Sequence, residues 1–163
     1  MDQCRYGMEI RNAAPAEVDR LARIWFDGWQ DAHAAILPAE LRRLRTLESF
    51  RDRLSARLYD VRVARVSGEP VGFCFIKGDE LYQLFVAASA RGSGVAAALV
   101  AEAETRLAAM GVSTAWLACA IGNDRAARFY EKCGWYRAGT MVNPAETTEG
   151  AFELKVWRYE KRL

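Results

Sequence analysis

The stretch that decides the fold is residues 84–97, with the sequence LFVAASARGSGVAA. An apolar, strand-like run ends in a short turn that contains Gly92 and Gly94, and a helical pattern begins directly after it. The first amides of a helix have no intrahelical partner, and the helix dipole makes that end positive. This turn therefore predicts a pyrophosphate site, where the glycines allow close approach of the backbone and Arg91 adds charge.

Two common phosphate-binding patterns do not describe this loop. No Gly-Lys-Ser/Thr follows the glycines, which excludes a Walker loop. Gly92, Gly94 and Ala97 match the dinucleotide pattern GxGxxG poorly, and the preceding strand follows a hairpin meander instead of a β-α-β crossover. Because a Gly-x-Gly alone is also common in ordinary turns, the assignment depends on the rest of the chain.

Strand and helix patterns alternate on both sides of the loop. The order is strand, two helical stretches, three strands, helix, strand, helix and two strands, which favours an α+β or mixed α/β sheet with helices on both faces. A polar loop with a proline is expected between the last two strands. The expected strands are residues 9–11, 61–66, 71–76, 80–86, 114–119, 135–141 and 152–160, and the helices are 15–32, 41–58, 94–110 and 124–133.

Length and charge exclude several classes of protein. The 163 residues suit a single domain, which we expect to span residues 1–163. With 23 basic and 21 acidic residues, the net charge of +2 does not indicate nucleic acid or a membrane as a partner. The run around Arg42, Arg43 and Arg45 is expected to be a solvated helix face, since an RNA-binding patch would have aromatic residues among the arginines.

The cysteines and the histidine argue against a metal site. Cys4, Cys74, Cys119 and Cys133 have no CxxC spacing, and His33 is the one histidine. The chain also starts without a signal-type apolar stretch, so we expect a reducing compartment, hence a cytoplasmic location.

Three motifs in order along the chain resemble the GNAT superfamily of acyl-CoA-dependent N-acetyltransferases. Arg91, Gly94 and Ala96 fit its Q/R-x-x-G-x-G/A signature. Residues 123–135 (NDRAARFYEKCGW) resemble its N-x-x-A-x-x-F-Y-x-x-x-G-F block, and residues 29–38 (WQDAHAAILP) resemble its segment between the first two helices. The resemblance covers nearly the whole chain. It implies an α/β fold with a mostly antiparallel, twisted sheet of about seven strands, and acetyl-CoA as co-substrate.

The resemblance also implies which residues bind coenzyme A. Leu84 and Val86 match the strand of the family's acyl-CoA motif, which is bulged and separates from the next parallel strand. Asn123 would contact the pantetheine, and it also suits the N-cap of the following helix. The full set of expected cofactor-binding residues is Leu84, Phe85, Val86, Arg91, Gly92, Ser93, Gly94, Val95, Ala96, Ala97, Asn123 and Tyr130.

Acetyl transfer to an amine sets three chemical tasks. The ammonium must lose a proton, the developing oxyanion needs donors, and the leaving thiolate takes a proton. Backbone amides of residues 84–86 suit the second task, and the resemblance assigns the third to Tyr130, whose alternative is a core position beside Phe129. In some family members a glutamate acts as the general base at the position where this chain has Ala118. Glu80 is therefore our candidate for the general base. The alternative for Glu80 is a solvent-exposed carboxylate at a strand end without a catalytic role, and the alternative base is His33.

Two functions remain open at this point. The first is an N-acetyltransferase that moves an acetyl group directly, in a ternary complex, to a primary amine of a small molecule or peptide. The second is a non-catalytic acyl-CoA-binding sensor or interaction module. An acyl-Cys119 intermediate is disfavoured, since no partner base is evident. The protein is expected to be a monomer or homodimer, and the sequence does not identify the acceptor. For a small cationic amine, the expected pocket residues are Trp29, His33, Leu37, Glu80, Tyr82 and Trp157.

Overall fold

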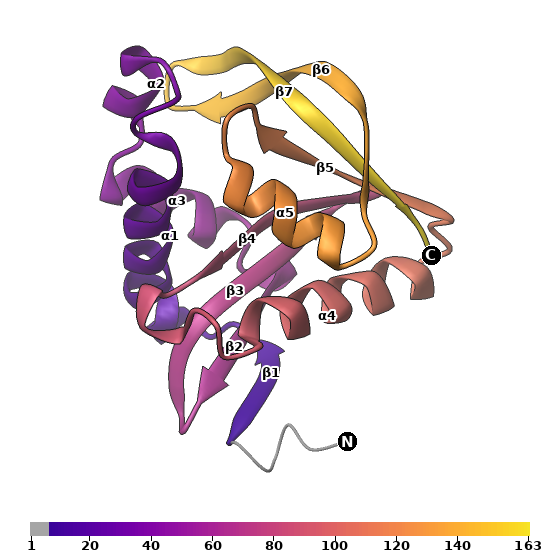
Figure 1. Ribbon diagram of the computed structural model, residues 1–163. Coiled ribbons are helices and arrows are strands. Elements are labelled where there is room, and N and C mark those ends of the chain that lie inside the picture. The colour runs from indigo at the N-terminus through magenta and orange to yellow at the C-terminus, as the bar shows by residue number, and fades with distance from the viewer. Residues whose placement is uncertain (1–6) are drawn as a thin grey trace.

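The computed structural model describes residues 7–163, so Cys4 lies outside the described residues. Within them, seven strands form one sheet in the order β1-β2-β3-β4-β5-β7-β6 (Figure 1). The strands are β1 (Met8–Asn12), β2 (Val61–Val66), β3 (Glu69–Lys77), β4 (Glu80–Val86), β5 (Thr114–Ala120), β6 (Tyr136–Thr147) and β7 (Gly150–Arg162). The helices are α1 (Val18–His33), α2 (Ala39–Leu44), α3 (Leu47–Ala56), α4 (Val95–Ala109) and α5 (Asp124–Lys132).

The sheet combines an antiparallel meander with one parallel junction. Strands β1 to β4 pair antiparallel in chain order, and β7 pairs antiparallel with both β5 and β6. Between these halves, β4 and β5 are parallel, as the crossover through α4 requires. The mixed, mostly antiparallel sheet predicted from the sequence is confirmed.

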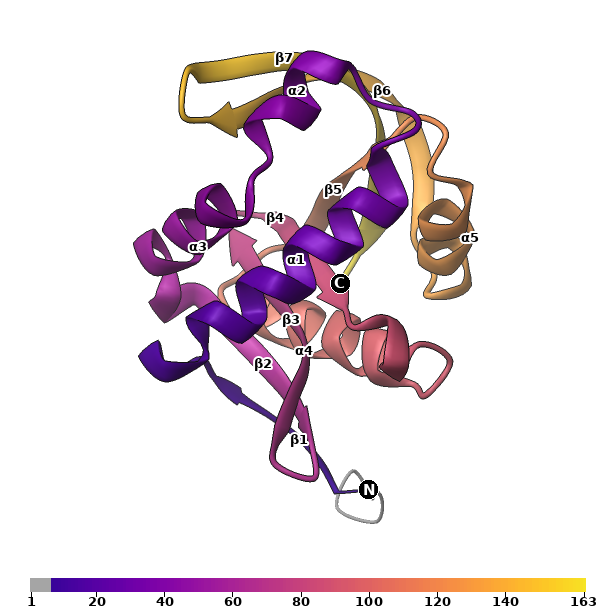
Figure 2. The same cartoon turned by 90° about the vertical axis from the view of Figure 1, so that its left-hand side faces the viewer.

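Helices cover both faces of the sheet and create two apolar cores. Helices α1 to α3 lie on one side and α4 and α5 on the other (Figures 1 and 2). In α1, apolar residues at helical spacing turn toward the sheet, where Trp25 packs against Phe50 and Phe73 with ring centroids 4.8 and 5.5 Å apart. On the opposite face, Leu99 and Leu107 of α4 are completely buried. Each helix is thus fixed by its own apolar stripe.

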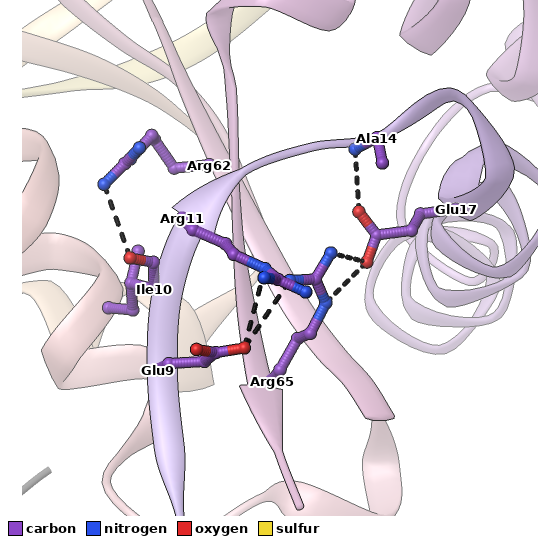
Figure 3. A network of polar contacts seen from close by, with 7 residues as sticks. All are labelled: Glu9, Ile10, Arg11, Ala14, Glu17, Arg62 and Arg65. Atoms are coloured by element: carbon purple, nitrogen blue, oxygen red, sulfur yellow. Dashed lines mark hydrogen bonds and ion pairs between the residues drawn. The ribbon is translucent and has the colours of Figure 1, made fainter. Parts of the chain in front are cut away.

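A polar network anchors the start of α1 to the sheet (Figure 3). Arg65 of β2 is only 5% exposed and donates to the Glu17 carboxylate through both Nε, at 2.6 Å, and Nη2. The other oxygen of Glu17 accepts from the Ala14 amide at 2.7 Å, and Glu9 of β1 lies 3.6 Å from Arg65 Nη1. Because a buried charge is tolerated only when paired, this network fixes the direction in which α1 enters the fold.

The expected helix at residues 41–58 is wrong as a single element. It is divided into α2 and α3, because Thr46 has extended backbone and caps α3 by accepting from the Ser49 amide at 3.1 Å. Leucines continue at helical spacing across the break, which is why the pattern predicted one helix. The break also turns Arg45 inward, where it is 5% exposed, so the prediction of a solvated arginine face fails at this residue.

The polar loop expected between the last two strands is also wrong. Residues 142–147 continue β6 and residues 150–151 belong to β7, so that only residues 148–149 form the turn. Pro144 is accommodated because β6 is the edge strand of the sheet. The long hairpin reaches α2, where Arg43 contacts Glu149 at 3.0 Å (Figure 1). The hairpin therefore forms one side of a space whose other side is formed by helices α1, α2 and α3.

Candidate active site

A cavity of about 420 Å³ lies between β4 and β5. The β4/β5 ladder consists of a single pair, Glu80 with Trp116. On the other side of β4, Phe75 pairs with Gln83 and Ile76 with Leu81, so Tyr82 is an extra, bulged residue. A bulge bends its strand, and here the rest of β4 leaves β5 and keeps an unpaired edge toward the cavity. Hydrogen-bonding backbone groups therefore face a space where a ligand can bind.

The N-terminus of α4 closes one end of this cavity with free amides. The first intrahelical bond runs from the Ala98 amide to the Gly94 carbonyl at 3.1 Å, and the amides of residues 92–97 donate to no other described residue. Gly92 and Gly94 have positive φ values of 76° and 88°, and a Cβ at either position would meet open space. The turn is thus an uncovered cradle of N–H groups at the positive end of a helix.

Two arginines stand at the rim of this cradle. Arg91 from the loop and Arg125 from α5 both contact Asp31 at the end of α1, at 2.8 and 3.3 Å. Their hydrogen bonds lower the pKa of Asp31. Arg125 was not anticipated from the sequence, although a basic residue two positions after Asn123 was a signal for a second cation near the glycine loop. One carboxylate therefore holds both guanidinium groups beside the free amides.

Most of the predicted cofactor-binding residues line this cavity. The exceptions are Ser93, whose exposed hydroxyl donates to the Ala90 carbonyl, and Val95, whose side chain is buried in the core. Only the amides of these two residues belong to the cradle. The predicted residues that line the cavity are Leu84, Phe85, Val86, Arg91, Gly92, Gly94, Ala96, Ala97, Asn123 and Tyr130.

Asn123, Tyr130 and Cys119 come together at the β5–α5 side of the cavity. Asn123 caps α5, accepting from the Ala126 amide at 3.3 Å. The Tyr130 ring is held between Phe129 and Trp135, with centroids 5.3 and 6.3 Å away, and burial raises the pKa of its hydroxyl, which keeps its proton at neutral pH. Burial likewise raises the pKa of Cys119 to about 11, so this thiol is a poor nucleophile.

A second cavity, of about 120 Å³, adjoins the first. The two share part of their walls: His33, Tyr82, Gln83, Ala118 and Ala120. Further lining comes from α1, α2, α3 and the β6–β7 hairpin, and includes the predicted residues Trp29, Leu37 and Glu80. The geometry gives one space for a long ligand and a smaller one for a compact ligand.

Trp157 does not belong to the second cavity, contrary to expectation. Neighbouring residues of a strand point to opposite faces, and the cavity is lined by Leu154 and Val156. Trp157 packs on the other face of the sheet, and the guanidinium of Arg137 lies 3.8 Å from its ring centroid. The sequence showed an aromatic residue near the end of the chain but not the register of β7.

Glu80 is a buried carboxyl group, so the solvent-exposed alternative is wrong. Glu80 is 8% exposed, and burial raises the pKa of its carboxyl to about 7, although the positive charge of Lys77 acts to lower it. Burial, and then the charge of Arg45, lower the pKa of His33 to about 4. His33 is therefore neutral at pH 7, whereas Glu80 is close to half-ionised.

Arg45 and Arg53 line the same small cavity and were not anticipated from the sequence. Arg53 Nη2 donates to the Tyr82 hydroxyl at 3.1 Å, and Arg45 Nη1 donates to the Glu146 carbonyl. Only the break between α2 and α3 brings Arg45 here.

Within residues 7–163, no group of three or more His, Cys, Asp or Glu side chains could hold a metal ion. None of the helices of this part of the chain is long and apolar enough to cross a membrane.

Gly28 of α1 allows the close approach of Phe85, which lines the larger cavity. A Cβ at Gly28 would lie 2.6 Å from Phe85 Cδ1, well inside van der Waals contact. We expect Gly28→Ala to lower the melting temperature by about 2–4 °C, because overpacking outweighs the better helix propensity of alanine. Calorimetric melting measures this, and adding Phe85→Leu should restore stability. An unchanged melting temperature in the single variant would contradict the contact.

Comparisons with known proteins agree with this architecture. A family model described as "Acetyltransferase (GNAT) family" matches residues 18–135, and no curated protein sequence matches the chain. Among solved structures, a GCN5-related N-acetyltransferase from Rhodopseudomonas palustris is 22% identical, with a TM-score of 0.75 over 95% of both chains. The PaiA N-acetyltransferase from Thermoplasma acidophilum, in complex with coenzyme A, is 20% identical, with a TM-score of 0.65 over 96% of this chain and 99% of that one. A ribosomal-protein-alanine N-acetyltransferase from Brucella melitensis is 21% identical, with a TM-score of 0.67 over 95% and 99%.

Proposed function

This chain belongs to the GNAT acetyltransferase family, whose model covers residues 18–135, and from that premise we propose that it transfers an acetyl group from acetyl-CoA to a primary amine. One observation carries the proposal. A cavity bordered by free amides and an unpaired strand edge shares a wall with a smaller cavity that contains a buried carboxyl group with a pKa of about 7. The first suits a thioester donor and the second an amine acceptor.

The residues around the larger cavity fit coenzyme A. The free amides of residues 92–97 would donate to the pyrophosphate, with Arg91 and Arg125 supplying charge. The unpaired edge of β4 would hydrogen-bond the pantetheine amides, and its N–H groups would stabilise the negative charge that develops on the acetyl oxygen. Acetyl-CoA itself supplies the activated acetyl thioester.

Gly94→Ala tests the amide cradle. The left-handed backbone of Gly94 costs an L-residue about 1–2 kcal/mol, so we expect the turn to relax and the amides to lose their common direction. Acetyl-CoA affinity, measured by calorimetric titration, should fall by about 10-fold or more.

Gly111→Ala is the matched control, because Gly111 ends the same helix with φ +87° and also has open space around it. It should cost similar stability and leave the affinity unchanged. Equal affinities in both variants would contradict the cradle.

Glu80 is proposed as the general base. The amine attacks the acetyl carbonyl carbon, the C–S bond breaks, and the proton that the amine loses passes to Glu80, directly or through water. A carboxylate with a pKa near 7 is a far better base at neutral pH than an ordinary glutamate. Glu80 would thereby take the role of the glutamate that some family members carry at the position of Ala118. It lies on the neighbouring strand and lines the same cavity as Ala118.

Tyr130 is proposed as the general acid for the leaving thiolate. Its raised pKa keeps the hydroxyl protonated, but it makes proton transfer to a free thiolate, whose thiol has a pKa of about 8.5, uphill. Donation is therefore expected to accompany C–S cleavage, when negative charge builds on sulfur. Cys119 has no part in this scheme, and direct transfer in a ternary complex needs no acyl-enzyme.

A thiol-release assay distinguishes an acetyltransferase from a non-catalytic acyl-CoA sensor. The sensor alternative is favoured by Ala118, where some family members carry the catalytic glutamate. The protein is incubated with acetyl-CoA and, in turn, small amines, polyamines, amino acids and N-terminal peptides. We expect at least one acceptor to give stoichiometric free thiol and acetylated product. If acetyl-CoA binds but no acceptor releases thiol, the protein is a sensor.

A further inference from the structure

The small cavity contains two guanidinium groups without a carboxylate partner. Arg45 is 5% exposed, and its Nε has no hydrogen-bond partner; the Nε of Arg53 is buried and unpartnered as well. Their hydrogen bonds go to neutral oxygens: Arg45 donates to the Glu146 carbonyl, and Arg53 donates to the Tyr82 hydroxyl. Neither arginine forms an ion pair with a carboxylate of residues 7–163. Both line the cavity, so the unmet hydrogen-bonding capacity borders a ligand site.

Buried cations of this kind normally have a counter-ion. Burial, and then the charge of Arg53, lower the pKa of Arg45 to about 10 against the opposing charges of Tyr82 and Glu146. The charged residues that line the cavity are Arg45 and Arg53 against Glu80 and Glu146. Burial raises the pKa of Glu80 to about 7, which keeps it partly protonated, and Glu146 already pairs with Lys77 at 3.2 Å. The site is therefore short of negative charge.

Two aromatic rings that line the small cavity, Trp25 and Tyr82, already face the protein's own cations. The guanidinium of Arg53 lies 4.5 Å from the Trp25 ring centroid. Lys77 Nζ lies 5.0 Å from the Tyr82 ring centroid, and Arg57 is 6.0 Å from the same ring. A second positive ligand would be repelled here, which argues against polyamines and other purely cationic acceptors.

We propose that the acceptor is a small free amino acid, whose carboxylate pairs with Arg45 and Arg53 and whose amine faces Glu80. This rests on the proposed acetyl transfer. A carboxylate gives the guanidinium groups the anion they lack, and an amine a few atoms away reaches the shared wall at Ala118 and Gln83. The 120 Å³ of the cavity equals roughly four waters at ~30 Å³ each, enough for an aminocarboxylate group.

The test is a binding titration of the protein–coenzyme A complex. The ligands are the standard L-amino acids and β-alanine, each compared with its carboxamide, which keeps the amine and removes the negative charge. We expect at least one amino acid to bind about 10- to 100-fold more tightly than its carboxamide. Arg45→Gln should abolish that difference by weakening the amino acid alone.

Two further variants keep the test decisive. Arg51→Gln is the matched control, since Arg51 is exposed, lies on α3 with Arg53, pairs with Asp19 and does not line the cavity; it should keep the full preference. Because Arg45 also holds the Glu146 carbonyl, Arg53→Gln serves if Arg45→Gln fails to fold.

The outcomes distinguish this inference from the proposed function. Thiol release with amines and carboxamides, without preference for a carboxylate, would overturn the inference and leave acetyl transfer intact. Arg45-dependent amino acid binding without thiol release would support the inference and remove the proposed catalysis. If no amino acid binds more tightly than its carboxamide, the inference is wrong.

Discussion

Glu80→Gln should lower kcat/KM by about 10²–10⁴-fold at pH 8, the largest loss expected of any single substitution. Glutamine keeps the size of the side chain and its place in the small cavity but cannot accept the proton of the attacking amine. Steady-state thiol release with the best acceptor measures the change. Glu69→Gln, the same change at an exposed position of β3, is the control and should leave the rate unchanged.

The pH dependence gives Glu80 a signature of its own. Since burial raises the pKa of its carboxyl to about 7, wild-type kcat should rise with pH through 7 as the base ionises. The variant should lack this inflection. A wild-type profile without it, or a Glu80→Gln enzyme of full activity, would show that another group takes the proton.

The same substitution should stabilise the folded protein at alkaline pH. The pKa of Glu80 is higher in the folded than in the unfolded chain, so the cost of ionising it on folding is absent below about pH 4.5 and complete above about pH 7. Glu80→Gln removes that cost. At pH 8 its free energy of unfolding should exceed that of the wild type by on the order of 1–2 kcal/mol, and the difference should disappear near pH 4.

Tyr130→Phe should lower kcat by about 10²-fold while acetyl-CoA affinity changes little. Phenylalanine preserves the ring contacts with Phe129 and Trp135 and removes only the hydroxyl that would protonate the leaving sulfur. Turnover and calorimetric affinity are measured on the same preparation. The two readouts separate loss of a proton donor from loss of the binding site.

A second tyrosine provides the control for this variant. Tyr136 is exposed and its hydroxyl donates to Glu160 at 3.2 Å, so Tyr136→Phe removes a hydroxyl far from the chemistry. It should keep wild-type turnover. Equal turnover in Tyr130→Phe and the wild type would remove Tyr130 from the mechanism, and a large loss of acetyl-CoA affinity would make it a binding residue instead.

The sheet and the glycine loop before α4 could be predicted because local physics determines them. The turn at Gly92 and Gly94 needs left-handed backbone that glycine adopts easily, and the helix after it buries residues at helical spacing, among them Leu99 and Leu107. The residues of this motif are neighbours in the sequence, so their meeting in space needs no long-range packing. Most of the cofactor-binding prediction therefore matches the lining of the larger cavity.

Five of the six expected pocket residues line the small cavity, but its arginines and its β6–β7 wall could not be predicted, because distant segments bring them in. Arg45 enters the cavity only through the break that Thr46 imposes, and a leucine stripe conceals that break. The β6–β7 wall depends on Pro144 being tolerated at a sheet edge, and the exclusion of Trp157 depends on the register of β7. These features follow from strand pairing and helix packing, on which local patterns carry little information.

The most direct test of the account compares acetyl-CoA with S-acetylpantetheine, which carries the same thioester without the pyrophosphate, by calorimetric titration of the wild-type protein. We expect acetyl-CoA to bind with a dissociation constant of roughly micromolar order, and S-acetylpantetheine to bind about 100-fold more weakly or not at all. Equal binding of the two, or no binding of acetyl-CoA, would contradict a site built on the free amides of residues 92–97.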